Sequence, residues 1–436
     1  MPKKILIIIV AILLLIAGIA SYFIFFSTKK PGTSTGTGIS LQDLFPFGDN
    51  GKFTNTNNND GDNTDQLPPD DTTTPIKAPR LRMITQGPIA GAYVFDGVRE
   101  KKQEGQQQPK VGIDGKPLPV ETEPVTIVRY IETSTGHTDE TYLDVIELIK
   151  LTNTTVPKIA EGYFAGKGGT SAILRYADEK NIIQTFSGAI PEKSLVPDTK
   201  LRGIYLPEET TTMAIAPDRE KIFTISKSDN GVVGTISLPD GTKKNQILSL
   251  DYTEWVAGWP SAKFVAITTK PSAKVPGYLY TIDTASKIMK KVLGGVNGLT
   301  TLTSPDMKKV LFSRSVNGGM TSSIYSTDAK SIIPLPGANT LPEKCVWQSA
   351  TILYCAVPSY LPSVDYPDAW YQGAISFNDQ IYKIDLNDYT SIVVGNPSSV
   401  NATIDATNLV VDPANTYLVF INKKDGSLWS LDLQPE

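Results

Sequence analysis

The chain has little of the residue types on which most catalytic and metal sites depend. Among its 436 residues there are one histidine and two cysteines. A lone histidine excludes a metal site built from several histidines. It also makes any Ser/His/Asp triad depend on His137, which lies in the polar, turn-like segment Ser134–Thr138. The sequence therefore predicts no catalytic residues, no cofactor and no metal.

Basic clusters are also absent. The chain carries 41 Lys and Arg against 45 Asp and Glu, with a formal net charge of −4. Affinity for nucleic acid comes from clustered basic side chains that neutralise phosphates, so nucleic acid is not an expected partner. Two loops resemble binding motifs and depart from them. Gly162–Gly169 has no Ser or Thr after its Gly-Lys pair, and Asp60–Asp65 has neither the glycine nor the distal glutamate of a calcium loop.

One long apolar run stands at the N-terminal end of the sequence. Ile5–Phe26 contains no charged residue and is long enough to cross a bilayer as a helix. Lys3 and Lys4 precede it, which favours a cytoplasmic N-terminus and an exported C-terminal domain. A cleaved signal peptide is the alternative, with Gly18–Ala20 as the cleavage site. The aromatic residues that follow Ala20 favour an uncleaved anchor.

The segment that follows has the composition of a linker. Residues 27–79 are rich in Thr, Gly, Ser, Asn, Asp and Pro, and such a segment cannot bury enough apolar surface to fold. About 50 flexible residues reach roughly 40 Å. We therefore expect a transmembrane anchor at 5–26, a disordered linker at 27–79 and a folded domain at 80–436.

The folded domain contains a recurring turn. Ala216-Pro217-Asp218, Ser304-Pro305-Asp306 and Asp412-Pro413-Ala414 each precede a short apolar strand, and Trp259-Pro260-Ser261 is a weaker copy. Between residues 124 and 349, similar units begin every 43 to 48 residues. Residues 299–335 contain four short strands within one such unit. This period and this strand content are typical of a β-propeller.

Counting the units gives the number of blades. Units begin near residues 124, 169, 217, 260, 305, 349 and 413. The sequence therefore predicts an all-β, seven-bladed propeller, with six or eight blades as alternatives. Residues 81–95 are expected to supply strands that close the ring with the C-terminal blade, which would leave few open sheet edges.

These repeats resemble a known family. The Ser-Pro-Asp turn, the strand Val310–Ser313 and the strand Tyr278–Asp283 are similar to the WD40-like repeats of TolB-type β-propellers. The segments Asn153–Lys158, Cys345–Trp347 and Tyr354–Pro358 also resemble uncharacterised membrane-anchored propellers of candidate-phylum bacteria. The resemblance implies an envelope propeller that binds other proteins, and it carries over no catalytic residues.

The two cysteines lie ten residues apart. A hairpin centred near Ala350 would place Cys345 and Cys355 opposite each other, at a separation that a disulfide can bridge. A compartment outside the cytoplasm would permit the bond. Two reduced thiols in the core are the alternative.

An insertion of about 20 residues lengthens the sixth unit. It is the best candidate for a binding surface, because loops on a rigid scaffold often carry function and because Tyr and Trp dominate binding hot spots. The partner-binding candidates are Tyr360, Tyr366, Trp370 and Tyr371. The alternative is that the insertion buries its own aromatic residues. The nearby Asp365, Asp368 and Asp379 suggest, more weakly, a carboxylate pair for sugar hydrolysis.

We therefore expect a single-pass membrane protein that is not an enzyme and presents its propeller outside the cytoplasm, where it binds an envelope protein or a wall polymer. The alternative is an envelope protein that binds or hydrolyses glycans through acidic residues at the mouth of the propeller.

Overall fold

The computed structural model describes residues 77–101, 121–191, 200–207 and 209–434. These residues form seven antiparallel sheets of four strands each, as the seven repeat units predict. The apolar run Ile5–Phe26 and the linker up to residue 76 lie outside the described residues. No helix in the described ranges is both long and apolar enough to span a membrane.

We number the sheets as blades 1 to 7 in the order of their first strands. Blade 1 contains β2 (Ile89–Glu100), β3 (Thr122–Glu132), β4 (Thr138–Tyr142) and β5 (Leu148–Lys150). Blade 2 contains β6 (Ile159–Ala165), β7 (Ser171–Ala177), β8 (Ile183–Ala189) and β9 (Arg202–Tyr205). Blade 3 contains β10 (Thr210–Ile215), β11 (Ile222–Ser228), β12 (Gly231–Ser237) and β13 (Asn245–Leu250). Blade 4 contains β14 (Trp255–Ser261), β15 (Phe264–Thr269), β16 (Pro276–Asp283) and β17 (Met289–Asn297).

The remaining blades follow the same plan. Blade 5 contains β18 (Thr300–Thr303), β19 (Lys309–Val316), β20 (Gly319–Ser326) and β21 (Ile332–Pro334). Blade 6 contains β22 (Cys345–Trp347), β23 (Ile352–Pro358), β24 (Asp379–Asp385) and β25 (Thr390–Gly395). Blade 7 contains β26 (Ala406–Val411), β27 (Tyr417–Asn422), β28 (Leu428–Asp432) and, as its outermost strand, β1 (Leu81–Met83). Three short helical turns are η2 (Pro342–Lys344), α2 (Asp368–Tyr371) and η3 (Pro397–Val400).

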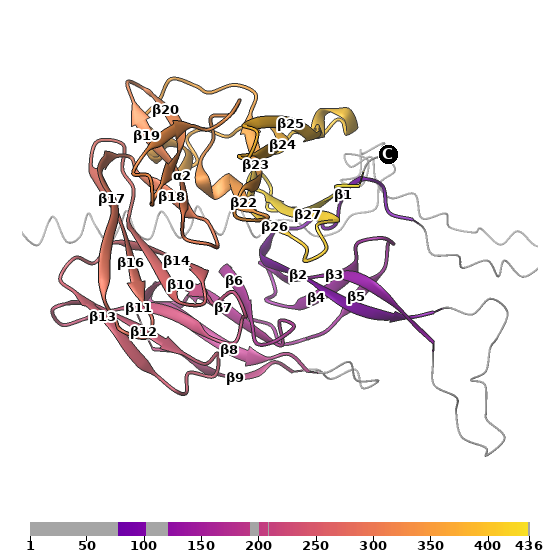
Figure 1. Ribbon diagram of the computed structural model, residues 1–436. Helices are drawn as coiled ribbons and strands as arrows, with labels where there is room; N and C mark the ends of the chain where they lie inside the picture. The colour runs from indigo at the N-terminus through magenta and orange to yellow at the C-terminus, as the bar shows by residue number, and fades with distance from the viewer. Residues whose placement is uncertain (1–76, 102–120, 192–199, 208, 435–436) are drawn as a thin grey trace, which may run out of the picture. The chain divides into compact units, whose positions relative to one another are not determined.

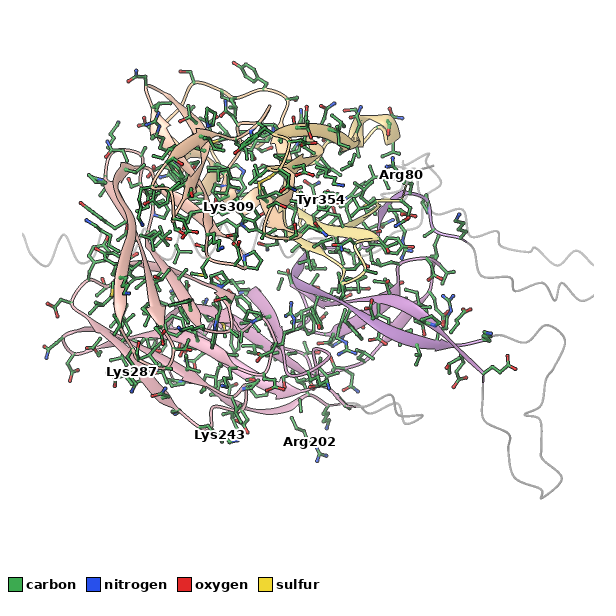
Figure 2. All side chains as sticks on the ribbon, in the orientation of Figure 1. Arg80, Arg202, Lys243, Lys287, Lys309 and Tyr354 are labelled. Carbon is green, nitrogen blue, oxygen red and sulfur yellow. A yellow bond between two sulfur atoms is a disulfide. The ribbon has the colours of Figure 1, made fainter. Side chains whose placement is uncertain are left out.

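The blades surround a common axis (Figure 1). The first strands of neighbouring blades contact each other, as β2 does with β6, β10 with β14, and β22 with β26. The first strand of each blade is therefore the inner strand and the last is the outer strand. The exposed side chains of Arg202, Lys243 and Lys287 extend outward from blades 2, 3 and 4 (Figure 2).

The hydrophobic core is divided among the contacts between blades. Seven clusters of buried apolar side chains each combine residues of two adjacent blades, one cluster for every contact around the ring. For example, Ile225 of blade 3 packs with Val265 of blade 4, and both are fully buried. Each sheet therefore buries its two faces against its two neighbours, and the ring is stabilised by burial of apolar surface.

The repeated turn has the same backbone in its three clear copies. The residue that follows the Pro-containing triplet has a positive φ, at Arg219 (61°), Met307 (64°) and Asn415 (58°). Its amide donates a hydrogen bond to the first residue of the turn, as from Met307 to the carbonyl of Ser304 at 3.0 Å. Proline fixes φ at the second position of such a turn, which explains why the triplet recurs between the first and second strands.

Antiparallel pairing places the connections at two rims. These turns, and those between third and fourth strands, lie at one rim, which we call the turn rim. The connections between successive blades and the loops between second and third strands lie at the other, which we call the connection rim.

The ring is closed by the segment that precedes blade 1. Strand β1 pairs with β28, with Leu81 opposite Leu431 and Met83 opposite Trp429. This confirms the expected closure for residues 81–83, whereas Ile89 and the residues after it form the inner strand of blade 1. Just before β1, Lys77 forms an isolated bridge with Val145 of blade 1.

The inner strands of blades 1 and 2 approach each other closely at two glycines. A Cβ atom added to Gly91 would lie 1.9 Å from the carbonyl oxygen of Gly162 and 2.7 Å from its carbonyl carbon. Only a residue without a side chain can stand there, because the atoms that it meets belong to the backbone. In contrast, a Cβ atom on Gly258, in the inner strand of blade 4, would meet nothing within 4 Å.

Candidate functional site

The insertion in blade 6 connects β23 to β24 and comprises residues 359–378. It lies at the connection rim and reaches three other blades. In blade 4, the amide of Ala273 donates to Oδ2 of Asp368 at 2.5 Å, and Lys274 forms an ion pair with Asp365 at 2.8 Å. In blade 7, Nζ of Lys423 donates to the carbonyl oxygen of Trp370 at 2.9 Å. In blade 5, Met320 packs in the same apolar cluster as Trp370. The insertion therefore bridges blades 4 to 7.

The four aromatic candidates of the insertion divide into two pairs. Tyr366 is 1% exposed and Trp370 is 3% exposed, and both pack with Leu341 and Phe377. Tyr360 is 73% exposed and Tyr371 is 40% exposed. The hypothesis that all four contact a partner is therefore wrong for Tyr366 and Trp370. Their aromatic side chains are buried against the propeller and do not reach the surface. The sequence could not separate the two pairs, since all four occur in one irregular, Pro-rich segment.

Tyr371 contacts the connection between blades 5 and 6. Its hydroxyl group donates a hydrogen bond to Oε1 of Glu343, the residue before Lys344 in η2. Burial raises the pKa of Glu343, and the hydrogen bond from Tyr371 lowers it in part. Burial and the nearby Glu343 raise the pKa of Tyr371. The exposed part of the insertion is thus held in place by a polar contact at the start of the inner strand β22.

A buried cluster of three charged side chains lies beneath α2. Nζ of Lys344 lies 2.7 Å from Oδ2 of Asp379 and 2.5 Å from Oδ1 of Asp405. All three side chains are 0% exposed, and each residue as a whole is at most 5% exposed. The same Nζ donates to the carbonyl oxygen of Ala406 at 2.9 Å. The rings of Trp370 and Phe377 lie beside it, with centroids 5.4 and 5.1 Å away. We call Lys344, Asp379 and Asp405 the Lys344 cluster.

The Lys344 cluster joins three connections of the rim. Lys344 ends the connection from blade 5, Asp379 begins β24 after the insertion, and Asp405 immediately precedes the inner strand of blade 7. Sequence reasoning missed Lys344 and Asp405, because lysine and aspartate are ordinarily exposed and their separation along the chain forms no motif. Burial raises the pKa of Asp379 to about 6, although the charge of Lys344 opposes the shift.

The three acidic residues considered for sugar hydrolysis do not form a pair. Asp365 is bound to Lys274, Asp368 accepts the amide hydrogen of Ala273, and Asp379 belongs to the Lys344 cluster. Each has a structural partner, which argues against a shared catalytic role for these three. In the described part of the chain, no three His, Cys, Asp or Glu residues are grouped so that they could hold a metal ion.

The two cysteines form a disulfide. Cys345 and Cys355 are directly opposite in the pairing of β22 with β23, and their sulfur atoms are bonded, with the α-carbons 4.1 Å apart. Both residues are buried in the cluster between blades 5 and 6. The bond joins β22, the inner strand of blade 6, to β23, and it lies next to Lys344 in the sequence.

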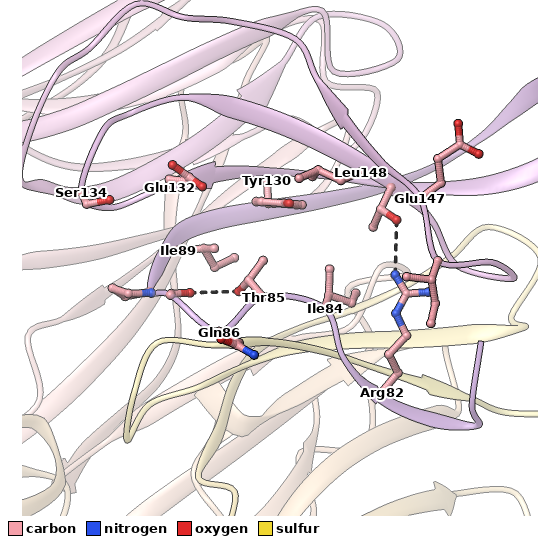
Figure 3. A pocket seen from close by; sticks show the side chains of 14 residues that line it. Arg82, Ile84, Thr85, Gln86, Ile89, Tyr130, Glu132, Ser134, Glu147 and Leu148 are labelled. Atoms are coloured by element: carbon pink, nitrogen blue, oxygen red, sulfur yellow. Dashed lines mark hydrogen bonds between the residues drawn. The ribbon is translucent and has the colours of Figure 1, made fainter. Parts of the chain in front are cut away.

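A groove lies between blades 7 and 1, at the closure of the ring. It encloses about 280 Å³. Ile84, Thr85 and Gln86 lie on one side of it and Tyr130 and Glu132 on the other (Figure 3).

The buried Arg82, at one end of this groove, holds the two blades together. It donates to the carbonyl oxygen of Val145 at 2.9 Å and to Oγ1 of Thr141 at 3.2 Å. Asp139, opposite Tyr130 in the pairing of β3 with β4, is buried nearby. Burial, together with the charge of Glu132, raises the pKa of Asp139 to about 6. Arg82 thus helps to close the ring at this groove.

Comparisons with known proteins gave matches among solved structures alone. No family model matches the chain, and no curated protein matches it. Among solved structures, an oligogalacturonate lyase in complex with manganese has a TM-score of 0.46 at 11% identity, covering 71% of this chain and 85% of that one. TolB from Acinetobacter baumannii has a TM-score of 0.38 at 12% identity, covering 78% and 79%. A β-propeller domain of a protease from Pyrococcus furiosus has a TM-score of 0.43 at 10% identity, covering 71% and 94%.

Proposed function

We propose that this protein is a membrane-anchored binding module that presents a β-propeller outside the cytoplasm to another protein of the cell envelope. The observation that carries the proposal is the insertion, which is anchored to blades 4 to 7 and leaves Tyr360 and Tyr371 at the surface. A loop held in this way loses little conformational entropy on binding, and exposed tyrosines supply large contact area at low entropic cost.

The anchor and the compartment are supported by separate features. The uncharged run Ile5–Phe26 has the length of a transmembrane helix, and residues 27–79 have the composition of a flexible linker. The disulfide between Cys345 and Cys355 is of the kind that persists outside the cytoplasm. A reporter enzyme that is active only outside the cytoplasm, fused after residue 436, tests the orientation. An inactive fusion that is nevertheless expressed overturns it.

The binding proposal is tested by crosslinking in cells, followed by detergent extraction, capture of the full chain and mass spectrometry. The test variant is Tyr360→Ala, which changes the more exposed tyrosine and leaves the contacts that anchor the insertion intact. The matched control is Tyr389→Ala, an exposed tyrosine at the turn rim of blade 6. We expect a reproducible protein partner that the control retains and the test variant loses.

Two results contradict the proposal. Equal capture by the test variant removes the insertion as the contact surface. Recovery of wall glycans without any protein from the wild type replaces protein binding with glycan binding, and a panel of purified glycans then identifies the ligand class.

A further inference from the structure

The Lys344 cluster combines an amine and a carboxyl group in a dry site. The ammonium group of Lys344 has three acceptors, Oδ2 of Asp379, Oδ1 of Asp405 and the carbonyl oxygen of Ala406. The side chain of Lys344 is 0% exposed, as are the two aspartate side chains. Two carboxylates and one ammonium leave an excess negative charge, and burial disfavours such a charge. One additional proton, or loss of a carboxylate, would remove it.

The two carboxyl groups of the cluster have different surroundings. Asp405 accepts hydrogen bonds from Nε1 of Trp370 at 2.9 Å and from the amide of Phe377 at 3.0 Å, in addition to Lys344. Asp379 accepts from Lys344 and from the amide of Ala406 at 2.7 Å, both through Oδ2. Its buried Oδ1 has no hydrogen-bond partner among the described residues. Asp405 is therefore the better stabilised anion, and Asp379 is the carboxyl group more easily held neutral.

We propose that Lys344 and Asp379 become joined by an amide bond between Nζ and Cγ, formed within the folded protein with Asp405 as the proton carrier. Transfer of one proton from Nζ to Asp379 converts the ion pair into a neutral amine beside a neutral acid, a change that a dry site favours. Nζ then attacks Cγ, and Asp405 accepts a proton from Nζ. That proton and the proton already on Asp379 both go to the departing oxygen. One N–C bond forms, one C–O bond breaks, and one water molecule leaves.

The hydrogen bonds indicate which oxygen remains. Oδ2 of Asp379 accepts from the amide of Ala406, a donor that stays in place when Oδ2 becomes the carbonyl oxygen of the amide. Oδ1 has no partner, so its loss as water breaks no hydrogen bond within the described structure. Fixed placement of the two reacting groups replaces the chemical activation that an amine and a free acid otherwise need. The product carries no charge at Lys344 or Asp379 and leaves Asp405 as the only ionised group of the cluster.

Trypsin digestion of the full chain provides a direct test. Lys330, Lys344 and Lys383 are consecutive tryptic sites, with no Lys or Arg between them. After denaturation, reduction and alkylation, an unlinked chain yields the separate peptides 331–344 and 345–383. A linked chain resists cleavage after Lys344 and yields one peptide, 331–383, lighter by one water molecule than the same alkylated peptide without the link. Fragmentation of this peptide locates the bond at Lys344 and Asp379.

Two variants separate the reaction from the fold. Lys423→Arg alters a neighbouring lysine whose side chain donates, among the hydrogen bonds described, only to the carbonyl oxygen of Trp370, and it should keep the link. Asp405→Asn removes the proton carrier, and it should give separate peptides from a protein that still shows β-sheet circular dichroism. Retention of the link in Asp405→Asn overturns the role of Asp405. Recovery of 331–344 and 345–383 from the wild type overturns the proposal, whether or not any variant folds.

Discussion

The indole N–H of Trp370 donates a hydrogen bond to Oδ2 of Asp405 over 2.9 Å. Trp370 belongs to the insertion of blade 6, and Asp405 is the residue before the inner strand of blade 7. This contact therefore joins the insertion to the framework of the ring. A residue that sequence reasoning placed at a binding surface is instead part of what holds that surface in position.

Replacement of Trp370 tests this role. We expect Trp370→Ala to lower the free energy of unfolding by about 3–5 kcal/mol, because a buried indole and its hydrogen bond are lost. Trp370→Phe keeps most of the packing and should cost about 1–2 kcal/mol, because Asp405 loses one of its hydrogen-bond donors. Urea denaturation measures both values. Tyr360→Ala, at an exposed position of the same insertion, should change stability by less than about 0.5 kcal/mol. Equal losses for Trp370→Ala and Tyr360→Ala would show that the insertion is not anchored through Trp370.

Gly91→Ala tests the close approach of the inner strands of blades 1 and 2. The added methyl group would collide with the backbone of Gly162, which cannot move without separating the two blades. We expect a loss of about 1–3 kcal/mol or more in the free energy of unfolding. Gly258→Ala places the same change in an inner strand with open space and should be nearly neutral. Similar stabilities of the two variants, measured by thermal unfolding, would contradict the close approach.

Asp139→Asn tests the raised pKa of a buried carboxyl group in blade 1. The pKa of Asp139 is about 6 in the folded protein, above the value of about 4 in an unfolded chain. The unfolded chain therefore binds fewer protons in this window, and ionisation of Asp139 lowers stability as the pH rises from about 4 to about 6. The stability of Asp139→Asn relative to the wild type should therefore be about 2 kcal/mol higher above this window than at pH 4. Denaturation at both pH values measures the difference. A pH-independent effect of the substitution would show that Asp139 titrates normally.

Reduction tests the contribution of the disulfide. A loop of this length predicts that the bond between Cys345 and Cys355 stabilises the fold by about 2–3 kcal/mol. The oxidised wild type should unfold at a correspondingly higher denaturant concentration than the reduced wild type. Cys345→Ala/Cys355→Ala serves as the control, and its unfolding midpoint should be the same with and without reductant. A wild type with the same midpoint in both conditions would show that the bond adds nothing to stability.

Local sequence patterns predicted most of the ring. Each of the seven expected units corresponds to one blade, and in blades 3, 5 and 7 the turn between the first and second strands has a backbone that Pro at its second position favours. The pairing of Cys345 with Cys355 followed from hairpin geometry alone. The closure by residues 81–83 followed from the need to pair the last edge.

Contacts between distant residues were not predictable in this way. Lys344 meets Asp405 across 61 positions in the chain, and no periodic pattern relates them. The same holds for Trp370, whose burial depends on where blades 5 and 7 place Met320 and Lys423. An irregular insertion takes its conformation from the surfaces that it meets, and these are products of the complete ring.

The closure of the ring also determines where mechanical load enters the domain. Among the described residues, tension transmitted along the chain from the N-terminal side reaches Lys77 first, at its bridge to Val145, and then the three paired residues of β1. These contacts form the seam between blades 7 and 1, so a pull on that side acts on the shortest strand of blade 7. We therefore expect a pull from that side to open the seam first, and we expect Arg82, which bonds Val145 across it, to raise the force required.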